Sequence, residues 1–455
     1  MRVQQAYRYA LDPAPAQAGA LFSHGGAARF AFNWALGLVK AALSRREAEK
    51  TYGVATELLT EVPWSLYALR RRWNAAKGQV APWWGENSKE AYNSGLEALA
   101  RALRNWADSR ASKRKGKKVG FPRFKSKHRT TPSCRFSTGT IRVEADRRHV
   151  TLPRLGTIRT CESIRKLARH LERGTGRILS ATIRLEGSRW FVSFTCEIDR
   201  AEHVPARPGA VVGVDLGLKA LAVLSTGEVV DNPKHHRSAL RRLRRRNRQL
   251  ARRTGPRTPT GGHREPSARW RKTKTALGKA HARVARQRRD GLHQLTSKLA
   301  AGYGTVVVED LNVSGMLANR RLSRAVADVG MGEVRRQLAY KTAWSGGRLV
   351  VASRWYPSSK TCSGCGVVKA RLALSERTYT CDGCGLVLDR DLNAARNLAA
   401  LAADVAQSCG ETVNARRGAV GPGARAGHAP VKREPRKRGT PPWQRGGLLI
   451  LTDKH

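Results

Sequence analysis

Acidic residues are scarce in this chain. Its 455 residues include 34 Asp and Glu against 86 Lys and Arg, so the formal net charge is +52 with histidine neutral. A local run of charge usually only solvates one face of a protein, but here the imbalance belongs to the whole chain. It disfavours a small acidic metabolite as the sole ligand and predicts a polyanionic partner, above all nucleic acid. The alternatives are a basic solvated surface and binding to an anionic membrane.

Long hydrophobic runs are also missing. No stretch approaches the ~20 apolar residues that span a bilayer, and the first 17 residues lack the apolar core of a signal peptide. We therefore expect no membrane association and a cytoplasmic protein associated with the prokaryotic nucleoid. Hydrophobic residues still make up 40% of the chain, which is enough for two or three domains with cores and excludes a wholly disordered basic protein.

Cysteine is sparse, and the eight cysteines are too few for a disulfide scaffold. Four of them form the pattern Cys362-x2-Cys365-x15-Cys381-x2-Cys384, in which a glycine follows each CxxC pair. Two such pairs predict one tetrahedral zinc ion held by four thiolates. Because four thiolates leave no position for water, this zinc would be structural. The other cysteines show no such spacing and are expected to be buried or free thiols: Cys134, Cys161, Cys196 and Cys409.

Helical periodicity marks residues 21–118, which we predict to be a helical domain ending in the basic linker Lys113–Lys118. A first apolar stripe follows Gly25-Gly26 and consists of Phe30, Trp34, Leu38 and Ala41. A second helix is expected to begin at the cap Asn87, with Glu90 three residues further on. Its stripe consists of Tyr92, Leu96, Leu99, Leu103 and Trp106. Core packing is the simpler interpretation of aromatics at helical spacing.

Strand-like alternation replaces the helical pattern after Val119. It is clearest after the turn Glu186-Gly187-Ser188, where the alternating apolar residues are Trp190, Val192, Phe194, Cys196 and Ile198. This pattern predicts an antiparallel β domain that forms a small barrel. The loop Phe121–Arg129 interleaves aromatics with positive charge, as a strand-binding surface would, although such loops are common in a chain this basic.

The pattern becomes α/β from Ala210 onwards. The predicted strands are Val211–Asp215, Ala220–Leu224, Thr305–Asp310 and Arg348–Trp355. A helix is expected from about Val326 to Ser345, and a final helix opens with the residues DRDLNAARNL. From about Ser408 the chain has no periodicity and is predicted to be a disordered basic tail.

Two very basic helices are predicted between Lys234 and Asp290, a segment with 21 Lys and Arg but only two acids. Each has a thin apolar seam, and a merely solvated hairpin would be expected to mix charges of both signs. The helices are therefore expected to lie along phosphates. The candidate contact residues are Arg241, Arg245, Arg248, Arg252, Lys272, Lys274 and Arg283.

Three carboxylates stand where a strand ends or a helix begins: Asp215, Glu309 and Asp391. Carboxylates at adjacent strand ends can converge on two Mg²⁺ ions about 4 Å apart, which is the active-site logic of RNase H-like nucleases. A single acid at such a position is usually a helix cap or a surface charge. Consecutive residues of a strand point to opposite faces, so either Glu309 or Asp310 can join the site, and spacing does not decide which. Asp389 and Asp391 pose the same question.

Several segments of the chain resemble, in order, the TnpB (OrfB) family encoded by insertion sequences, whose members are compact relatives of the type V CRISPR effector nucleases. The segments are GVDLGLKALAVLSTG, VVVEDLN, YPSSKTCSGCG with CDGCG, and DRDLNAARNL, together with RYALDPAPAQAGALF, ARFAFNWAL and GKKVGFPRFKSK. The match spans roughly residues 5–415.

This resemblance implies an RNA-guided DNA endonuclease that uses an RNA from the transposon end as its guide and cuts double-stranded DNA beside a short target-adjacent motif. It implies that Asp215, Glu309 and Asp391 are the Mg²⁺ ligands, with Asp310 and Asp389 as neighbours. It also implies that the adjacent motif is read between the helical insert and the barrel. The positions expected there are Tyr52, Lys89, Asn93, Ser137 and Thr138.

The fold implied is multidomain, α/β plus β-barrel: an RNase H-like (RuvC) nuclease with an inserted zinc ribbon, preceded by a wedge barrel with a helical insert. The expected domains are a wedge-like barrel at 1–20 and 119–205, a helical recognition insert at 21–118, a RuvC-like nuclease at 206–360 and 386–407, a zinc ribbon at 361–385 and the tail at 408–455.

Two other functions compete with this interpretation. A transposase acting without an RNA guide would need a paired-histidine metal motif with a tyrosine nucleophile, and no two of the twelve histidines lie two residues apart. A nuclease-inactive RNA-guided repressor is disfavoured because none of the three acids is replaced.

Overall fold

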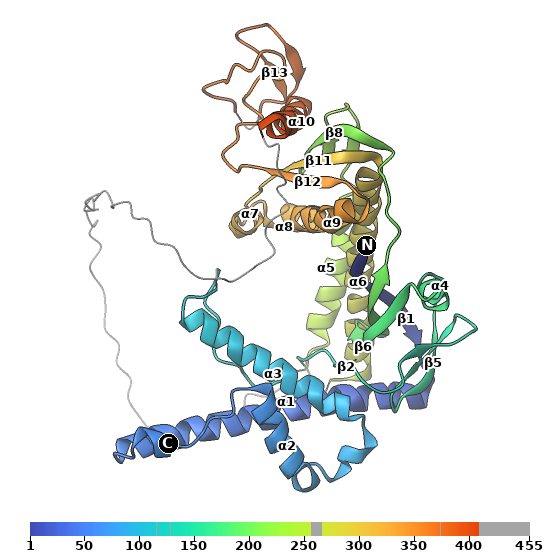
Figure 1. Cartoon of the computed structure of the whole chain (residues 1–455), viewed down its shortest axis with the longest axis vertical. Helices are drawn as coiled ribbons and strands as arrows, with labels where there is room; N and C mark the ends of the chain where they lie inside the picture. Colours follow the sequence, from blue (N-terminus) through green and yellow to red (C-terminus); the bar gives the residue numbers. More distant parts are fainter. Residues whose placement is uncertain (115, 128, 256–265, 374, 409–455) are drawn as a thin grey trace. The chain divides into compact units, whose positions relative to one another are not determined.

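The computed structural model describes residues 1–408 except 115, 128, 256–265 and 374. The tail predicted for residues 408–455, including Cys409, lies outside the described residues apart from Ser408. The described chain contains a seven-stranded sheet, a five-stranded sheet and a two-stranded sheet (Figure 1). None of its helices is both long enough and apolar enough to cross a membrane.

The seven-stranded sheet is antiparallel at every pairing and has the order β2-β6-β7-β1-β5-β4-β3. Its strands are β1 (Arg2–Asp12), β2 (Ser133–Phe136), β3 (Arg142–Val143), β4 (His149–Leu152), β5 (Gly156–Thr160), β6 (Gly176–Glu186) and β7 (Arg189–Asp199), with α4 (Arg165–Glu172) between β5 and β6. The alternation predicted for β7 is confirmed, since the predicted inward residues from Trp190 to Ile198 are all buried. The predicted turn joins β6 to β7 at Gly187.

Three helices share the core of this sheet: α1 (Pro15–Thr51), α2 (Leu66–Val80) and α3 (Lys89–Arg110). α1 and α3 pack against β2, and α2 packs on α1 and α3. Short 3-10 helices, η1 (Thr56–Leu58) and η2 (Pro82–Glu86), lie between them in the chain. The start predicted at Gly25-Gly26 was wrong, because α1 begins at Pro15 and runs through both glycines. The predicted boundary between residues 20 and 21 therefore lies inside α1.

The face predicted for α1 was also wrong. Its most buried hydrophobic side chains are Leu21, Ala27, Ala31, Ala35, Leu36 and Val39, whereas Phe30 and Trp34 only flank this core. Small residues occupy the contact because α3 approaches closely: a Cβ atom at Gly95 would collide with the Ala28 carbonyl oxygen. The predicted stripe of α3 is confirmed from Tyr92 to Leu103. Its cap is Ser88 rather than Asn87, and the Ser88 hydroxyl accepts from the Glu90 N–H at 3.3 Å.

The five-stranded sheet has the order β10-β9-β8-β11-β12. Its strands are β8 (Arg207–Asp215), β9 (Ala220–Leu224), β10 (Val229–Asp231), β11 (Tyr303–Glu309) and β12 (Arg348–Ala352). The pairings of β11 with β8 and with β12 are parallel, whereas β9 pairs antiparallel with β8 and β10. The α/β pattern predicted for this part of the chain is thus confirmed.

The helices of this part are α5 (His235–Arg252), α6 (Ala268–Gly302), α7 (Val313–Ala318), α8 (Ser323–Val329), α9 (Met331–Trp344) and α10 (Arg390–Ser408). One face of the sheet packs on α6 and α9 through Val212, Val214, Val306 and Val308, and the other packs on α10 through Val307. The single helix predicted from Val326 to Ser345 is two, because the chain breaks at Gly330 with φ 75°.

The two-stranded sheet consists of β13 (Thr378–Thr380) and β14 (Val387–Asp389). Both strands flank the second CxxC pair, so the structural unit around the cysteines continues to Asp389, beyond the expected end at residue 385.

Candidate functional site

Asp215 and Glu309 lie at the same edge of the five-stranded sheet. Their strands are parallel, and Val214 pairs with Val308, so the next residue of each strand stands side by side at the carboxyl end. Side chains alternate along a strand, and Val214 and Val308 face α6 and α9. Asp215 and Glu309 therefore face the opposite side, where α10 packs.

The start of α10 brings Asp391 to this face. The helix approaches β8 very closely, because a Cβ atom at Gly213 would collide with the Ala395 carbonyl oxygen. Asp391 lies in the first turn of α10. It carries negative charge near Asp215, since its charge contributes to the perturbation of that residue. The three predicted acids thus belong to one face of the sheet, and the charges of Glu309 and Asp391 act on Asp215.

The choice between Glu309 and Asp310 follows from the same alternation. Asp310 belongs to the other side of the sheet, where its carboxylate pairs with Arg335 of α9 and with Arg354 at 2.8 Å. Glu309 accepts a hydrogen bond from the Ser358 hydroxyl at 2.5 Å. The sequence reasoning missed Ser358, whose only signal was its place in the segment after β12.

The Asp389 carboxylate caps a helix and so differs in role from that of Asp391. One oxygen of its carboxylate accepts from the backbone N–H groups of Asp391 at 2.9 Å and Leu392 at 3.1 Å. This is the geometry of a helix cap, so Asp389 fixes the start of α10. The Asp391 carboxylate lies 3.9 Å from the Arg377 guanidinium.

Asp215 is strongly perturbed. Burial raises the pKa of its carboxyl to about 8, and the charges of Glu309 and Asp391 add to the effect. A carboxyl in such surroundings holds a proton at neutral pH, and a divalent cation would replace that proton and relieve the repulsion among the acids. The donor set of three carboxylates therefore suits a hard cation with oxygen ligands.

The four predicted cysteines form a compact cluster. Their sulfur atoms all lie within 4.8 Å of one another, with 3.6 Å between Cys362 and Cys384 and 3.5 Å between Cys365 and Cys381. Sulfur atoms around a tetrahedral zinc ion, at about 2.3 Å from the metal, would be about 3.8 Å apart. Backbone N–H groups of Cys384 and Gly383 lower the pKa of the Cys381 thiol to about 6. The cluster thus fits a metal that binds thiolates.

The cysteine unit is hydrogen-bonded to α10. The Asn393 side chain accepts from the Ser363 N–H at 2.9 Å and donates to the Thr361 carbonyl at 2.7 Å. Asn397 donates to the same carbonyl at 2.7 Å. Because Asn393 lies two residues after Asp391, these hydrogen bonds help the cysteine unit to fix the position of Asp391.

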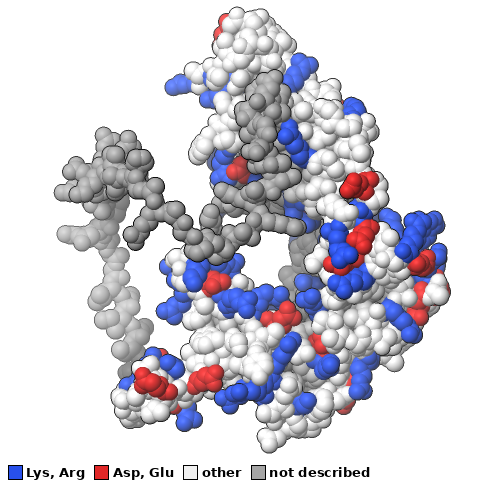
Figure 2. Space-filling model, viewed as in Figure 1, with Lys and Arg blue, Asp and Glu red and all other residues white. Residues whose placement is uncertain are grey.

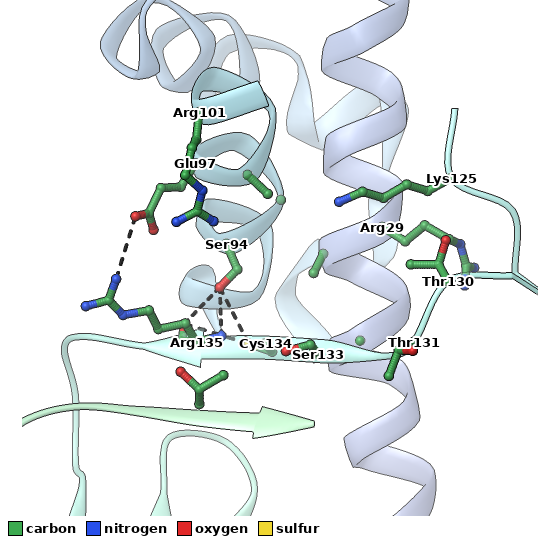
Figure 3. A pocket seen from close by; sticks show the side chains of 15 residues that line it. Arg29, Ser94, Glu97, Arg101, Lys125, Thr130, Thr131, Ser133, Cys134 and Arg135 are labelled. Atoms are coloured by element: carbon green, nitrogen blue, oxygen red, sulfur yellow. Dashed lines mark hydrogen bonds and ion pairs between the residues drawn. The ribbon is translucent and has the colours of Figure 1, made fainter. Parts of the chain in front are cut away.

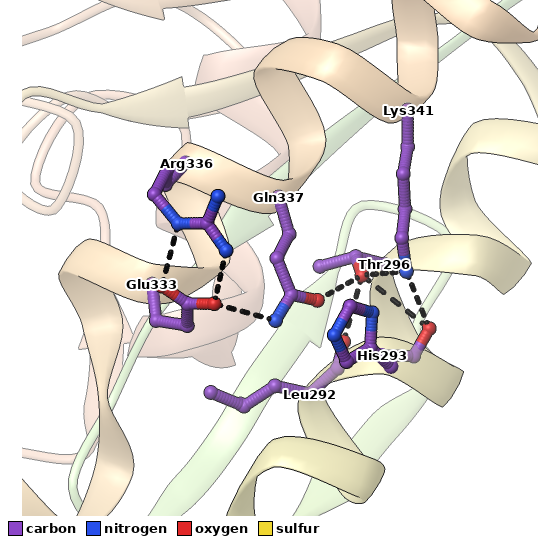
Figure 4. Close-up of polar contacts among 7 residues, drawn as sticks. All are labelled: Leu292, His293, Thr296, Glu333, Arg336, Gln337 and Lys341. Carbon is purple, nitrogen blue, oxygen red and sulfur yellow. Dashed lines mark hydrogen bonds and ion pairs between the residues drawn. The ribbon is translucent and has the colours of Figure 1, made fainter. Parts of the chain in front are cut away.

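A polar network also holds α9 against α6 on the other face of the sheet (Figure 4). The Lys341 ammonium donates to the His293 carbonyl at 2.8 Å, to the Thr296 hydroxyl at 2.7 Å and to the Ser297 hydroxyl at 2.9 Å. Burial lowers the pKa of Lys341 to about 8. Thr296 in turn donates to Gln337 at 2.8 Å. The network fixes the helix that carries Arg335.

Four of the five positions expected to read the adjacent motif lie near the carboxylate of Glu90, which the sequence pattern predicted only as part of a helix cap. Glu90 is only 6% exposed, and it accepts from the hydroxyls of Ser137 and Thr138 at 2.8 Å each. Asn93 also hydrogen-bonds to it, and Lys89 precedes it at the start of α3. Burial opposes ionisation, but these hydrogen bonds outweigh it and hold the pKa of Glu90 below its usual value.

Tyr52 does not join this group. It is 86% exposed and ends α1, twenty residues after the contact of Phe32 with Gly95. At 1.5 Å per residue, that is about 30 Å along the helix axis.

A hollow of about 320 Å³ opens beside the contact of α1, α3 and β2 (Figure 3). Its charged lining residues are Arg29, Glu97, Arg101, Lys125 and Arg135. Burial and the nearby Arg101 lower the pKa of Lys125 to about 8. Four cations against one acid favour an anionic ligand.

We predict that Glu90→Gln lowers the free energy of unfolding at pH 7 by about 1.5–3 kcal/mol, because hydrogen bonds to a charged acceptor are lost. Since the folded protein lowers the pKa of Glu90, this stabilisation is present above the usual value of 4.5 and is lost as the pH falls below it. Chemical denaturation of both proteins at pH 7 and near pH 3.5 measures the difference.

The control for this prediction is Glu97→Gln on the same helix, because Glu97 is only half-buried and pairs with Arg135 at 3.6 Å. Its effect should stay within about 1 kcal/mol, as for most exposed ion pairs. Equal losses in the two variants, or a Glu90 effect that persists at low pH, would contradict the assignment.

The two basic helices predicted between Lys234 and Asp290 are α5 and α6, which pack side by side (Figure 1). All seven predicted contact residues are exposed. None of the seven forms an ion pair with an acid among the described residues. Lys and Arg are widely spread over the face shown in Figure 2, where Asp and Glu are few.

Three family profiles match parts of this chain. The family profile OrfB_IS605, described as "Probable transposase", matches residues 193–320, and "Cas12f1-like, TNB domain" matches residues 332–398. A third profile, "Helix-turn-helix domain", matches residues 1–48, where this chain has β1 and the single helix α1.

The "Putative RNA-guided DNA endonuclease Rv2885c" of Mycobacterium tuberculosis is 40% identical over 414 residues, covering 87% of this chain and 86% of that protein. A "Putative RNA-guided DNA endonuclease" of Streptomyces pristinaespiralis is 33% identical, covering 96% and 97%. The chain therefore belongs to the TnpB (OrfB) family. Among solved structures, a Cas12f1-sgRNA-target DNA complex matches with TM-score 0.43 and 13% identity, covering 88% of this chain and 99% of that chain.

Proposed function

We propose that this protein is an RNA-guided DNA endonuclease of a transposable element, which cuts DNA next to a short target-adjacent motif by two-metal-ion hydrolysis. The observation that carries the proposal is the arrangement of Asp215, Glu309 and Asp391 on the α10 face of the sheet. The names of its relatives support guided cutting of DNA.

The three acids would hold Mg²⁺, which when bound activates a water molecule and stabilises the leaving oxygen of a phosphodiester. The chain's own residues prepare this site. Ser358 orients Glu309, Asp389 fixes the start of α10 by capping it, and Gly213 lets α10 come close enough to bring Asp391 to Asp215.

The four cysteines would hold one structural zinc ion. We assign residues 206–360 and α10 to a RuvC-like nuclease, with the zinc ribbon inserted between β12 and α10. The strand order supports this assignment, because a mixed sheet with the acids at the carboxyl ends of parallel strands suits an RNase H-like fold. β1 and residues 119–205 would form the wedge-like barrel, and its helical recognition insert would begin with α1 at Pro15 and end at residue 118.

The nucleic-acid partners would be a guide RNA derived from the transposon end and double-stranded target DNA. The exposed cations of α5 and α6 suit the phosphates of a guide–target heteroduplex, which such proteins hold by its backbone. The adjacent motif would be read by Lys89, Asn93, Ser137 and Thr138. The hollow at Lys125 and Arg135 would receive a DNA phosphate beside them.

The experiment that tests this function starts from the RNA that copurifies with the protein in cells containing its native locus. We expect one discrete RNA from the transposon end, and a complex rebuilt with a reprogrammed guide should cut a matching plasmid only when Mg²⁺ is present. Cutting without RNA would favour the unguided transposase. Guided binding without cutting would favour the repressor, and the absence of a discrete RNA would overturn the proposal.

A further inference from the structure

Trp355 is an unusually exposed tryptophan. Its side chain is 87% exposed, and no aromatic ring or cation packs on the indole among the described residues. Tryptophan is highly buried on average, because exposing so large an apolar surface to water is unfavourable. This exposed indole therefore offers a surface on which a ligand can pack.

The backbone around Trp355 is fixed on both sides. The Tyr356 N–H donates to the Ser353 carbonyl at 3.0 Å, and the Tyr356 hydroxyl donates to the Asn397 carbonyl of α10 at 3.2 Å. Ser358 donates to Glu309 at 2.5 Å. Trp355 thus lies at the tip of an anchored turn, which presents the indole at a defined place.

This turn leaves the sheet at the edge that carries the acids. Ala352, the last residue of β12, pairs with Glu309 on the neighbouring parallel strand. Neighbouring strands are about 4.8 Å apart, and three residues beyond a strand end reach about 10 Å at most. Trp355 is therefore within reach of the nucleotides that would flank a phosphodiester bound at the acids.

Positive charge surrounds the indole. Trp355 lines a hollow of about 500 Å³ together with Asp310, Arg335 and Arg354. Both arginines pair with the one carboxylate of Asp310, which holds them in place and leaves one positive charge uncompensated. An aromatic face beside guanidinium groups is the combination that binds single-stranded nucleic acid, because the bases stack and the phosphates are attracted.

We propose that Trp355 is a stacking platform for an unpaired base of the DNA strand being cut, with Arg335 and Arg354 attracting the adjoining phosphate. This inference rests on the proposed nuclease function. An unpaired base is required because base pairs in a duplex cover one another's faces. The platform would hold the strand single-stranded at the entrance of the site and so position its phosphodiester.

The test compares the RNA-loaded wild type with Trp355→Ala and Trp355→Phe. Matched target DNA carries 2-aminopurine at single positions across the cut site, and Ca²⁺ replaces Mg²⁺ in the fluorescence measurement. We expect quenching at one position with the wild type and Trp355→Phe, and recovery of the fluorescence with Trp355→Ala. Single-turnover cutting in Mg²⁺ should be about tenfold to a hundredfold slower for Trp355→Ala.

The control variant is Tyr67→Ala, because Tyr67 is also highly exposed, at 76%, but belongs to α2. It should change neither signal, and none of the variants should change the melting temperature or the affinity for RNA. If the wild type cuts and Trp355→Ala cuts equally fast with unchanged quenching, the platform is overturned while the nuclease stands. If the wild type fails to cut its programmed target, the proposed function fails and the platform falls with it.

Discussion

The Asp215→Ala protein should bind its guide RNA normally and fail to cut DNA, with a rate lower by on the order of 10³-fold or more. The charges of both other acids contribute to the raised pKa of the Asp215 carboxyl, so Asp215 interacts with each of them. Removing it takes away a shared metal ligand. The cations of α5 and α6, which we propose to bind RNA, lie on other elements and are untouched.

Single-turnover cleavage of a matched plasmid in Mg²⁺ measures the loss, and a filter-binding titration measures RNA affinity. The neighbouring acids supply matched controls. Glu309→Gln should lose cutting as Asp215→Ala does. Asp310→Asn, one residue on, should retain it within about tenfold, because Asp310 faces the other side of the sheet and acts on the site only through Arg335 and Arg354. Undiminished cutting by Asp215→Ala, or equal losses from Glu309→Gln and Asp310→Asn, would remove the mechanism.

Sequence pattern located the elements of this site but left its pairs of acids undecided. A strand ending in Glu309-Asp310 offers two carboxylates, and the choice depends on which face α10 covers. That face is fixed by the register of β11 against β8 and by the contact at Gly213. Neither can be read from spacing, because both join residues that are distant in the chain. Asp389 likewise looks equivalent to Asp391 until its capping hydrogen bonds are seen.

In the helical region, the sequence pattern predicted α1 and α3 but not the face of α1 that is buried. Apolar periodicity found α1 but put the large aromatics Phe30 and Trp34 at its centre, whereas the closest contacts are made by alanines. Where two helices cross closely, small side chains occupy the middle and large ones lie beside it. Sequence pattern also treated Glu90 as part of a helix cap. Its carboxylate instead accepts hydrogen bonds from Ser137 and Thr138, 47 and 48 residues further along the chain.

The cysteine cluster was the most predictable part, because ligand spacing alone specifies it. Its link to the acids was not predictable, since it runs through Asn393 and Asn397. Because of this link, we expect loss of the zinc ion to have a large effect on cutting. Cys381→Ser should lose the bound zinc and slow cutting by on the order of 100-fold, because structural zinc supplies much of the folding energy of such small units.

Cutting should slow because the cysteine unit helps to hold α10, which carries Asp391, in place. Without zinc the segment around Thr361 and Ser363 loses its fixed place, and Asn393 loses two hydrogen-bonding partners next to Asp391. Elemental analysis should find one zinc per wild-type chain and less in the variant, while RNA affinity stays the same. Cys161→Ser is the control, because Cys161 is an exposed free thiol outside the cluster and its loss should change neither zinc content nor cutting. Full activity in a zinc-free Cys381→Ser protein would show that α10 holds Asp391 without the cysteine unit.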